Sequence, residues 1–459
     1  VIDAAVLDEV TALVEWPVAV TGRFDAGFLR LPEEVLMATL QGHQRYFPVR
    51  GAGGKLLAHF ITLANLASRD ADQVRRGNER VVKPRLADAA FFWDQDLRRP
   101  LPEREPALAD IVFQRGLGSL RDKSARVATL GTAMAAKLCA DVAAVTRSAL
   151  LSKTDLLTDL VKEFPELQGR MGYYYASAGG ETNAVAVAIE EQYLPRHSGD
   201  RLAASPAGRC LALADRIDTL AGVFALGKKP SGNKDPFGLR RAALGLVRTL
   251  IEGRLDLHLP DLLDAAVAAQ PVKVADRGAL VRELYEFIVD RMRAYYLDGQ
   301  APGFAAGDVS AEMFEAVRLR TPASPLDFHE RLDAVRSFLA MAEAPSLAVA
   351  NKRIANILKS VKETLPDHVD PARFVAPEER QLHETVEALL PLHRTGLASR
   401  DYREVLRRLA ALRDPVDAFF TAVMVNAEDP ALRRNRLALL QRLRQAFLDV
   451  ADLSCLNAG

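Results

Sequence analysis

The pattern of apolar and polar positions predicts a mainly helical chain with a small amount of strand near its start. Apolar residues recur at helical spacing, and helical runs are predicted over 121–140, 144–163, 183–193 and 207–226. Near the start, residues 16–24 have the composition of a strand. Two further apolar runs flank the glycine-rich residues 50–55, which predicts a β-hairpin. A helix is also predicted over 75–93, and Pro84 should bend or interrupt it.

The same pattern divides the chain into four parts, because 459 residues are too many for one hydrophobic core. Loops rich in proline and glycine separate the periodic segments. We therefore expect a mainly α, multidomain fold. Its parts are an α+β portion over 1–105, a helical domain over 106–260, a helical linker region over 261–345 and a helical domain over 346–459.

The last of these parts contains two predicted helices separated by a short acidic break. The second helix begins with a group of arginines, and its apolar stripe consists of Leu440, Leu443, Phe447 and Val450. Arg436 falls on that stripe, so it needs a carboxylate partner such as Asp417 or Asp429. Arg433 and Arg434 are candidates for contact with a phosphate backbone. The alternative for both is a solvated face of an ordinary helix.

A second basic feature lies in the middle of the chain. Lys228, Lys229 and Lys234 stand in a loop, and Arg240 and Arg241 follow in the next predicted helix. The pair Asp235–Pro236 fits the N-cap and first position of that helix. A basic loop before a helix N-terminus suits RNA phosphates, although lysines in a loop can also contact only water.

Composition narrows the classes of function. Lys+Arg and Asp+Glu are both 60, so any nucleic-acid binding must use local basic patches. Three widely separated cysteines favour neither a disulfide framework nor a zinc site, which is typical of a reducing, cytoplasmic setting. No uninterrupted apolar run is long enough to predict a membrane span, so no membrane association is expected.

Two glycine-rich loops that contain lysine do not have the spacing of a phosphate-binding P-loop. Gly51–Lys55 precedes a predicted strand, and the loop from Gly227 to Lys234 lacks the required Lys-Ser or Lys-Thr. The sequence thus predicts no ATP site, no catalytic residue and no metal site in this chain.

Several dispersed motifs together resemble the β subunit of bacterial glycyl-tRNA synthetase, and they occur in the order found in that subunit. They are Val14-Glu-Trp-Pro-Val, Gly42-His-Gln-Arg-Tyr-Phe-Pro-Val, Arg76-Gly-Asn-Glu-Arg-Val, Asp88-Ala-Ala-Phe-Phe-Trp, Glu163-Phe-Pro-Glu-Leu-Gln-Gly, Ile189-Glu-Glu-Gln-Tyr-Leu-Pro-Arg and Lys234-Asp-Pro-Phe-Gly-Leu-Arg-Arg-Ala-Ala. The segment from Phe419 to Ser454 resembles the anticodon-binding domain at the C-terminus of that subunit. This domain is similar to that of arginyl-tRNA synthetase, but the earlier motifs do not fit that enzyme.

The resemblance implies a C-terminal part of a longer subunit that binds tRNA(Gly). In that family two α and two β subunits assemble, and the α subunit carries the catalytic core together with ATP and magnesium. The implied phosphate contacts come from the basic residues above and from a pair at the start of the last domain, and Asn435 is the candidate reader of a base edge. The full set is Lys228, Lys229, Lys234, Arg240, Arg241, Lys352, Arg353, Arg433, Arg434 and Asn435.

The middle part of the chain resembles an HD-type phosphohydrolase domain. Such a site needs histidines with its carboxylates, yet no histidine lies between His59 and His197. We therefore expect Asp155, Asp159 and Asp215 to be structural carboxylates. A degenerate HD-type phosphohydrolase and an assembly scaffold for the α subunit are the alternative functions.

Overall fold

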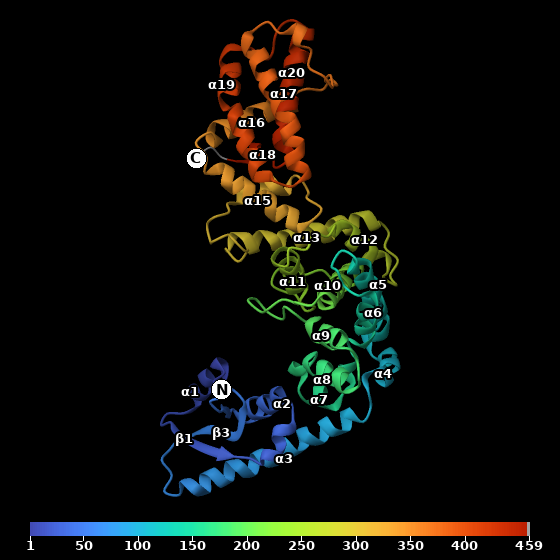
Figure 1. The fold of residues 1–459 in the computed structure, drawn as a ribbon, viewed down its shortest axis with the longest axis vertical. Helices are drawn as coiled ribbons and strands as arrows, with labels where there is room; N and C mark the ends of the chain where they lie inside the picture. Colours follow the sequence, from blue (N-terminus) through green and yellow to red (C-terminus); the bar gives the residue numbers. More distant parts are fainter. Residues whose placement is uncertain (457–459) are drawn as a thin grey trace. The chain divides into compact units, whose positions relative to one another are not determined.

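The computed structural model describes residues 1–456, and it confirms a mainly α fold with a small sheet near the start (Figure 1). The chain forms two compact units, one over residues 1–215 and one from residue 216 onward. The boundaries expected at 105, 260 and 345 remain predictions. Among the described residues, no helix has both the length and the apolar character needed to cross a bilayer.

The first unit contains a three-stranded antiparallel sheet. Strand β3 (Leu56–Ala64) lies between β1 (Val18–Arg23) and β2 (Phe47–Arg50). The predicted strand over 16–24 and the predicted hairpin are both confirmed, since β2 and β3 pair on either side of the glycine-rich turn. Short helical elements surround the sheet: α1 (Ala4–Leu13), η1 (Ala26–Arg30), α2 (Glu33–Ala38) and η2 (Thr39–His43).

The long helix α3 (Ala71–Leu97) packs against β1. It starts at Asp70, whose carboxylate accepts the Gln73 amide at 2.9 Å. The predicted helix over 75–93 is thus present and longer than expected, and Pro84 does not interrupt it. Val82 and Leu86 are buried on either side of the proline, so their packing offsets the hydrogen bond that proline cannot donate.

The rest of the first unit is helical apart from a short hairpin, β4 (Val112–Gln114) with β5 (Gly118–Ser119). The helical run predicted over 144–163 is present but not continuous, because α6 (Val142–Leu151) ends at Leu151 and α7 (Asp159–Glu163) begins at Asp159. After Leu151 the Ser152 and Thr154 hydroxyls bond to the carbonyls of Ala149 and Leu151 at 2.8 and 2.6 Å, which competes with continued helix. The other elements are α4 (Leu101–Arg104), η3 (Glu105–Asp110), α5 (Leu120–Ala135), α6 (Val142–Leu151), η4 (Thr154–Leu157), α7 (Asp159–Glu163), η5 (Pro165–Leu167), α8 (Arg170–Ala178) and α9 (Asn183–Glu191).

The second unit is helical in the residues that the structure describes. Helix α10 (Pro206–Ala225) runs across the boundary between the units. It is followed by α11 (Leu239–Glu252), α12 (Leu259–Ala268), α13 (Arg277–Leu297), α14 (Ala311–Arg318) and α15 (Pro325–Leu339). The remaining helices are α16 (Ala344–Lys359), η6 (Pro371–Arg373), α17 (Pro377–Ala398), α18 (Tyr402–Leu409), η7 (Ala410–Leu412), α19 (Arg413–Ala422), α20 (Pro430–Leu448) and η8 (Leu453–Cys455).

Helices α16 to α20 pack on one another as a bundle (Figure 1). The two helices predicted with an acidic break are α19 and α20, which confirms that prediction. The carboxylate of Asp429 caps α20 by accepting the Ala431 amide at 2.8 Å, and Pro430 takes the first helical position. The predicted apolar stripe from Leu440 to Val450 is buried in the bundle.

Candidate nucleic-acid interface

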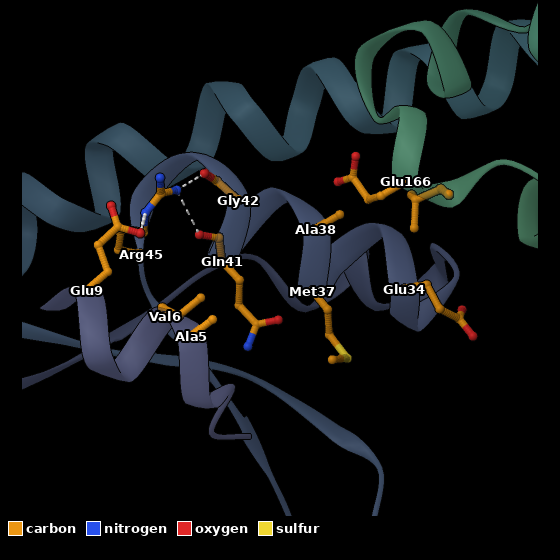
Figure 2. Close-up of a pocket in the computed structure, with 11 residues that line it drawn as sticks. Ala5, Val6, Glu9, Glu34, Met37, Ala38, Gln41, Gly42, Arg45 and Glu166 are labelled. Atoms are coloured by element: carbon orange, nitrogen blue, oxygen red, sulfur yellow. Dashed lines mark hydrogen bonds and ion pairs between the residues drawn. The ribbon is translucent and has the colours of Figure 1, made fainter. Parts of the chain in front are cut away.

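One pocket of the first unit lies between α1, α2 and η2 and has a volume of about 390 Å³ (Figure 2). Its polar groups are mostly engaged with one another. Arg45 pairs with Glu9 at 2.7 Å and donates to the Gln41 carbonyl at 3.3 Å. Glu34 and Glu166 also line the pocket, so its lining carries more carboxylates than cations. This charge balance does not suit a phosphate backbone.

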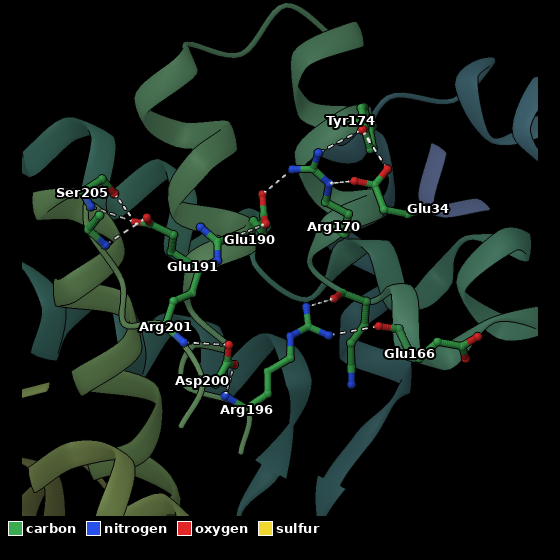
Figure 3. A network of polar contacts seen from close by, with 12 residues as sticks. Glu34, Glu166, Arg170, Tyr174, Glu190, Glu191, Arg196, Asp200, Arg201 and Ser205 are labelled. Atoms are coloured by element: carbon green, nitrogen blue, oxygen red, sulfur yellow. Dashed lines mark hydrogen bonds and ion pairs between the residues drawn. The ribbon is translucent and has the colours of Figure 1, made fainter. Parts of the chain in front are cut away.

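A polar network in the same unit joins α2 to α8 and α9 (Figure 3). Arg170 bonds to Glu34 at 2.7 Å and to Glu190 at 2.8 Å, and Tyr174 donates to Glu34 at 2.9 Å. Burial lowers the pKa of Arg170, but the carboxylates of Glu190 and Glu34 outweigh it and raise the pKa above its ordinary value. Arg170 is thus a permanently charged structural link between these helices.

Two of the carboxylates that we expected to be structural, Asp155 and Asp215, bind protein groups. Lys153 and Lys123 place their Nζ atoms 3.0 and 3.3 Å from Asp215 Oδ1, and both lysines are buried. Asp155 is fully buried and accepts the Gly169 amide at 2.5 Å. Burial raises the pKa of the Asp155 carboxyl and lowers the pKa of the Lys153 ammonium.

This arrangement does not fit a divalent cation. Two ammonium groups stand beside the Asp215 carboxylate, where a further positive charge would be repelled. Within residues 1–456, no cluster of three His, Cys, Asp or Glu residues has the geometry of a metal site. A metal-dependent phosphohydrolase is therefore not favoured.

The basic loop, which we define as residues 227–238, joins α10 to α11. Hydrogen bonds of 3.1 and 2.9 Å between the backbones of Ser231 and Lys234 close a tight turn within it. Lys228, Lys229 and Lys234 are all exposed. Lys229 forms an ion pair with Glu283 of α13, and Lys228 Nζ lies 5.8 Å from the Phe237 ring centroid. The loop therefore presents three lysines on one short, folded segment.

The start of α11 differs from the expectation. The helix begins at Leu239, so Pro236 precedes it and does not occupy its first position. Asp235 nevertheless accepts the amides of Leu239 and Arg240, both at 2.9 Å. Gly238 has a left-handed backbone with φ of 64°, which inserts a turn between the capping carboxylate and the helix. Arg240 and the exposed Arg241 therefore lie in the first turn of α11, a few residues after the three lysines.

Arg433 and Arg434 lie in the first turns of α20, and both contact the segment after α16. Arg433 bonds to Glu363 at 3.0 Å. Arg434 lies 3.7 Å from Glu363 and donates to the Thr364 carbonyl at 3.3 Å. Their side chains remain 42% and 46% exposed. Such exposed pairs are weak, so both guanidinium groups can still meet a phosphate.

Asn435 has a structural environment. It is buried, its side-chain oxygen accepts the Asp370 amide at 2.8 Å, and its side-chain nitrogen donates to the Asp370 carbonyl at 3.0 Å. Both ends of the amide are thus used to hold the segment before α17. This placement argues against the expected reading of a base edge by Asn435.

Arg436 is buried, as its position on the apolar stripe predicts, and it has a carboxylate partner. That partner is Glu379 of α17 at 2.5 Å; the named candidates Asp417 and Asp429 contact other groups. Arg436 also donates to the Met424 carbonyl at 2.8 Å.

Lys352 and Arg353 are both exposed on α16. The guanidinium carbon of Arg353 lies 4.2 Å from the centroid of the Phe420 ring on α19. Sequence reasoning placed the two cations but missed Phe420. The only available signal was the Phe419-Phe420 doublet. Consecutive residues of a helix point in different directions, so one of the two rings could be expected to lie outside the core.

Two family models match the chain. The model described as the glycyl-tRNA synthetase beta subunit matches residues 1–310, and the DALR anticodon binding domain matches residues 347–454. The second range is the helical bundle that carries Lys352, Arg353, Arg433 and Arg434.

Curated relatives extend this similarity over the whole chain. The chain is 47% identical over 457 residues to a protein of Ectopseudomonas mendocina named glycine–tRNA ligase beta subunit, covering 100% of this chain and 66% of that protein. Proteins of the same name from Xanthomonas campestris pv. campestris and Pseudomonas aeruginosa are 48% and 45% identical, covering 98% and 100% of this chain and 64% and 66% of theirs. The chain thus spans just under two thirds of the length of these relatives.

Proposed function

The chain belongs to the glycyl-tRNA synthetase β subunit family, and we propose that it forms the tRNA-handling part of a glycine–tRNA ligase. It binds tRNA(Gly) and holds it in position for ATP-dependent glycylation. One observation carries this proposal: the residues that match an anticodon-binding domain also present exposed cations at two places, on α16 and at the start of α20.

Electrostatic attraction to the tRNA backbone supplies the affinity in this proposal. The basic loop and the start of α11 contribute one patch, and the bundle of α16 to α20 contributes another. The chain has no net charge, so these patches and not a general positive field attract the RNA. Each phosphate contact releases counterions, which makes binding depend on salt. The contacts come from Lys228, Lys229, Lys234, Arg240, Arg241, Lys352, Arg353, Arg433 and Arg434.

The reaction itself is assigned to a partner. In this proposal the α subunit binds ATP and magnesium and forms the aminoacyl-adenylate, and two α and two β subunits assemble in the cytoplasm. The present chain contributes no catalytic residue. Its effect is positional, because holding the tRNA acceptor end beside the adenylate turns an encounter between two molecules into a step within one complex.

The proposal is tested with the full-length β subunit co-purified with its α partner. Binding is measured across a salt series for a tRNA with a glycine anticodon and for the same tRNA with its anticodon changed. We expect tighter binding of the first tRNA and a loss of affinity as salt rises. Replacing Lys228 and Lys234 with alanine should reduce the slope of log affinity against log salt by about 1 for each phosphate contact removed.

The matched control replaces Lys55 and Lys137, two exposed lysines outside both patches, with alanine. This variant removes the same charge and should keep the slope of the unaltered protein. Equal losses in the two variants would mean that only net charge matters. Glycylation that proceeds normally while the β subunit shows no affinity for tRNA would instead support an assembly scaffold.

A further inference from the structure

A groove runs between α16 and α19 in the C-terminal bundle and has a volume of about 500 Å³. Its lining combines one cation, one carboxylate, one aromatic ring and small or apolar groups. The residues that matter here are Ser346, Val349, Arg353, Asp417 and Phe420. A groove of this size, open to solvent and both apolar and charged, can take a flat, polar ring.

One side of the groove is a stacking surface. Arg353 and Phe420 form a cation–π pair with 4.2 Å between the guanidinium carbon and the ring centroid. Phe420 is held in place by the fully buried Phe419, whose ring centroid is 5.5 Å away in an edge-to-face arrangement. Val349 adds an apolar side chain that is 54% exposed. Unstacked RNA bases bind to such aromatic and guanidinium planes.

The other side of the groove offers a hydrogen-bond acceptor. Asp417 is half exposed, and the Ser346 hydroxyl lies 2.7 and 2.9 Å from its two carboxylate oxygens. Arg413 Nε lies 3.8 Å from the same carboxylate. An ionised carboxylate only accepts hydrogen bonds, and it has more lone pairs than these partners use. It therefore selects a base with an exocyclic amine.

We propose that this groove holds a cytosine of the tRNA anticodon, with its ring against the Arg353–Phe420 pair and its N4 amine donating to Asp417. The assignment rests on the proposed function, because every glycine codon begins with two guanosines and every glycine anticodon therefore carries two cytosines. Uracil would place a carbonyl oxygen against the carboxylate, and two acceptors repel. The groove thus distinguishes cytosine from uracil by the direction of one hydrogen bond.

The test measures binding of full-length β subunit, assembled with its α partner, to tRNA(Gly) and to versions with either anticodon cytosine changed to uridine. For the unaltered protein, one of the two changes should weaken binding by about tenfold or more. In Asp417→Asn the preference for cytosine should fall to within about threefold, because an amide can also donate to the uracil oxygen. Phe420→Leu should weaken binding of all the tRNAs by a similar factor.

The control is Asp414→Asn, which removes the same charge from the same helix. The Asp414 side chain is 93% exposed. It should leave both affinity and preference unchanged. Ser346→Ala is a second variant, which removes one hydrogen-bond partner of the Asp417 carboxylate but keeps the carboxylate itself. It should weaken the preference for cytosine less than Asp417→Asn does, with the same fold by circular dichroism.

Two results would overturn the assignment while leaving tRNA binding intact. Retention of the full cytosine preference by Asp417→Asn would mean that another part of the molecule reads the base. Loss of the α partner from Asp417→Asn and Phe420→Leu, with unchanged tRNA binding, would make the groove a protein contact. Absence of salt-dependent tRNA binding by the unaltered protein would instead reject the proposed function.

Discussion

Arg436 and Glu379 form a buried ion pair that joins α20 to the first turn of α17. Arg436 Nε lies 2.5 Å from Glu379 Oε1. Glu379 has no exposed surface, and its other carboxylate oxygen accepts the amides of Val375 and Ala376, both at 2.8 Å. One carboxylate therefore caps a helix and neutralises a buried guanidinium at the same time. The pair fixes how two helices of the anticodon-binding-type bundle pack.

Replacing Arg436 with methionine should destabilise the bundle by about 3–5 kcal/mol, because Glu379 would remain buried without its counter-charge. Hydrogen exchange of the amides in α17 and α20 measures this loss. The control is Arg442→Met. Arg442 pairs with Glu387, but both side chains are about a third exposed, so this change should cost less than about 1 kcal/mol. Equal costs would mean that the buried pair contributes no more than a surface pair.

The same carboxylate gives the bundle an acid-sensitive component. Burial raises the pKa of Glu379, but the bonds from Arg436, Ala376 and Val375 outweigh burial and hold the pKa below its ordinary 4.5. A depressed pKa stabilises the folded state above pH 4.5, and this contribution is lost as the pH falls through the folded-state pKa. The difference in unfolding free energy between the unaltered protein and Glu379→Gln should therefore be constant from pH 7 to 5 and shrink below pH 4.5. A difference that did not change with pH would contradict this.

Local chemistry predicted much of this domain from the sequence. The periodic stretch with its acidic break predicts α19 and α20, and the helical phase of Arg436 predicts both its burial and its need for a carboxylate. Its partner could not be predicted, because Glu379 lies 57 residues away and only the packing of α17 against α20 brings it close. The buried environment of Asn435 could not be predicted for the same reason, because its hydrogen-bond partner Asp370 is distant in sequence.

Competition between local and tertiary effects explains the other differences. Pro84 is a helix breaker by local rules, yet α3 continues through it because residues on both sides are buried. The run after Leu151 has helical periodicity, yet hydroxyl groups that bond to the preceding carbonyls end the helix. The groove between α16 and α19 was not predictable at all, since it exists only where two separate helices meet.

The carboxylate of Asp215 should be essential for stability and not for metal binding. In Asp215→Asn the buried ammonium groups of Lys123 and Lys153 lose a counter-charge, and we expect a loss of about 3 kcal/mol in urea unfolding of the first unit. Asp159→Asn is the control, because Asp159 and its partner Lys162 are more than half exposed. Stabilisation of the unaltered protein by millimolar Mn²⁺, absent in Asp215→Asn, would contradict this prediction and revive a metal site.

Glu363 competes with tRNA for Arg433 and Arg434 if those arginines contact phosphates. The carboxylate lies 3.0 Å from Arg433 and 3.7 Å from Arg434, and its side chain is 39% exposed. Removing it frees two cations without moving them from α20. Removing the arginines takes the cations away. An RNA-binding role thus predicts opposite effects of the two changes, whereas a purely structural role predicts the same effect.

We therefore expect Glu363→Ala to strengthen tRNA binding and steepen its dependence on salt, while alanine at both Arg433 and Arg434 weakens binding and flattens the salt slope by about 2. Glu428→Ala removes an exposed carboxylate from the loop before α20 and controls for charge alone. Filter binding across a salt series gives both affinity and slope. If Glu363→Ala weakened binding as the arginine variant does, the ion pairs of Glu363 with the two arginines would serve to anchor the segment after α16. The RNA would then bind elsewhere.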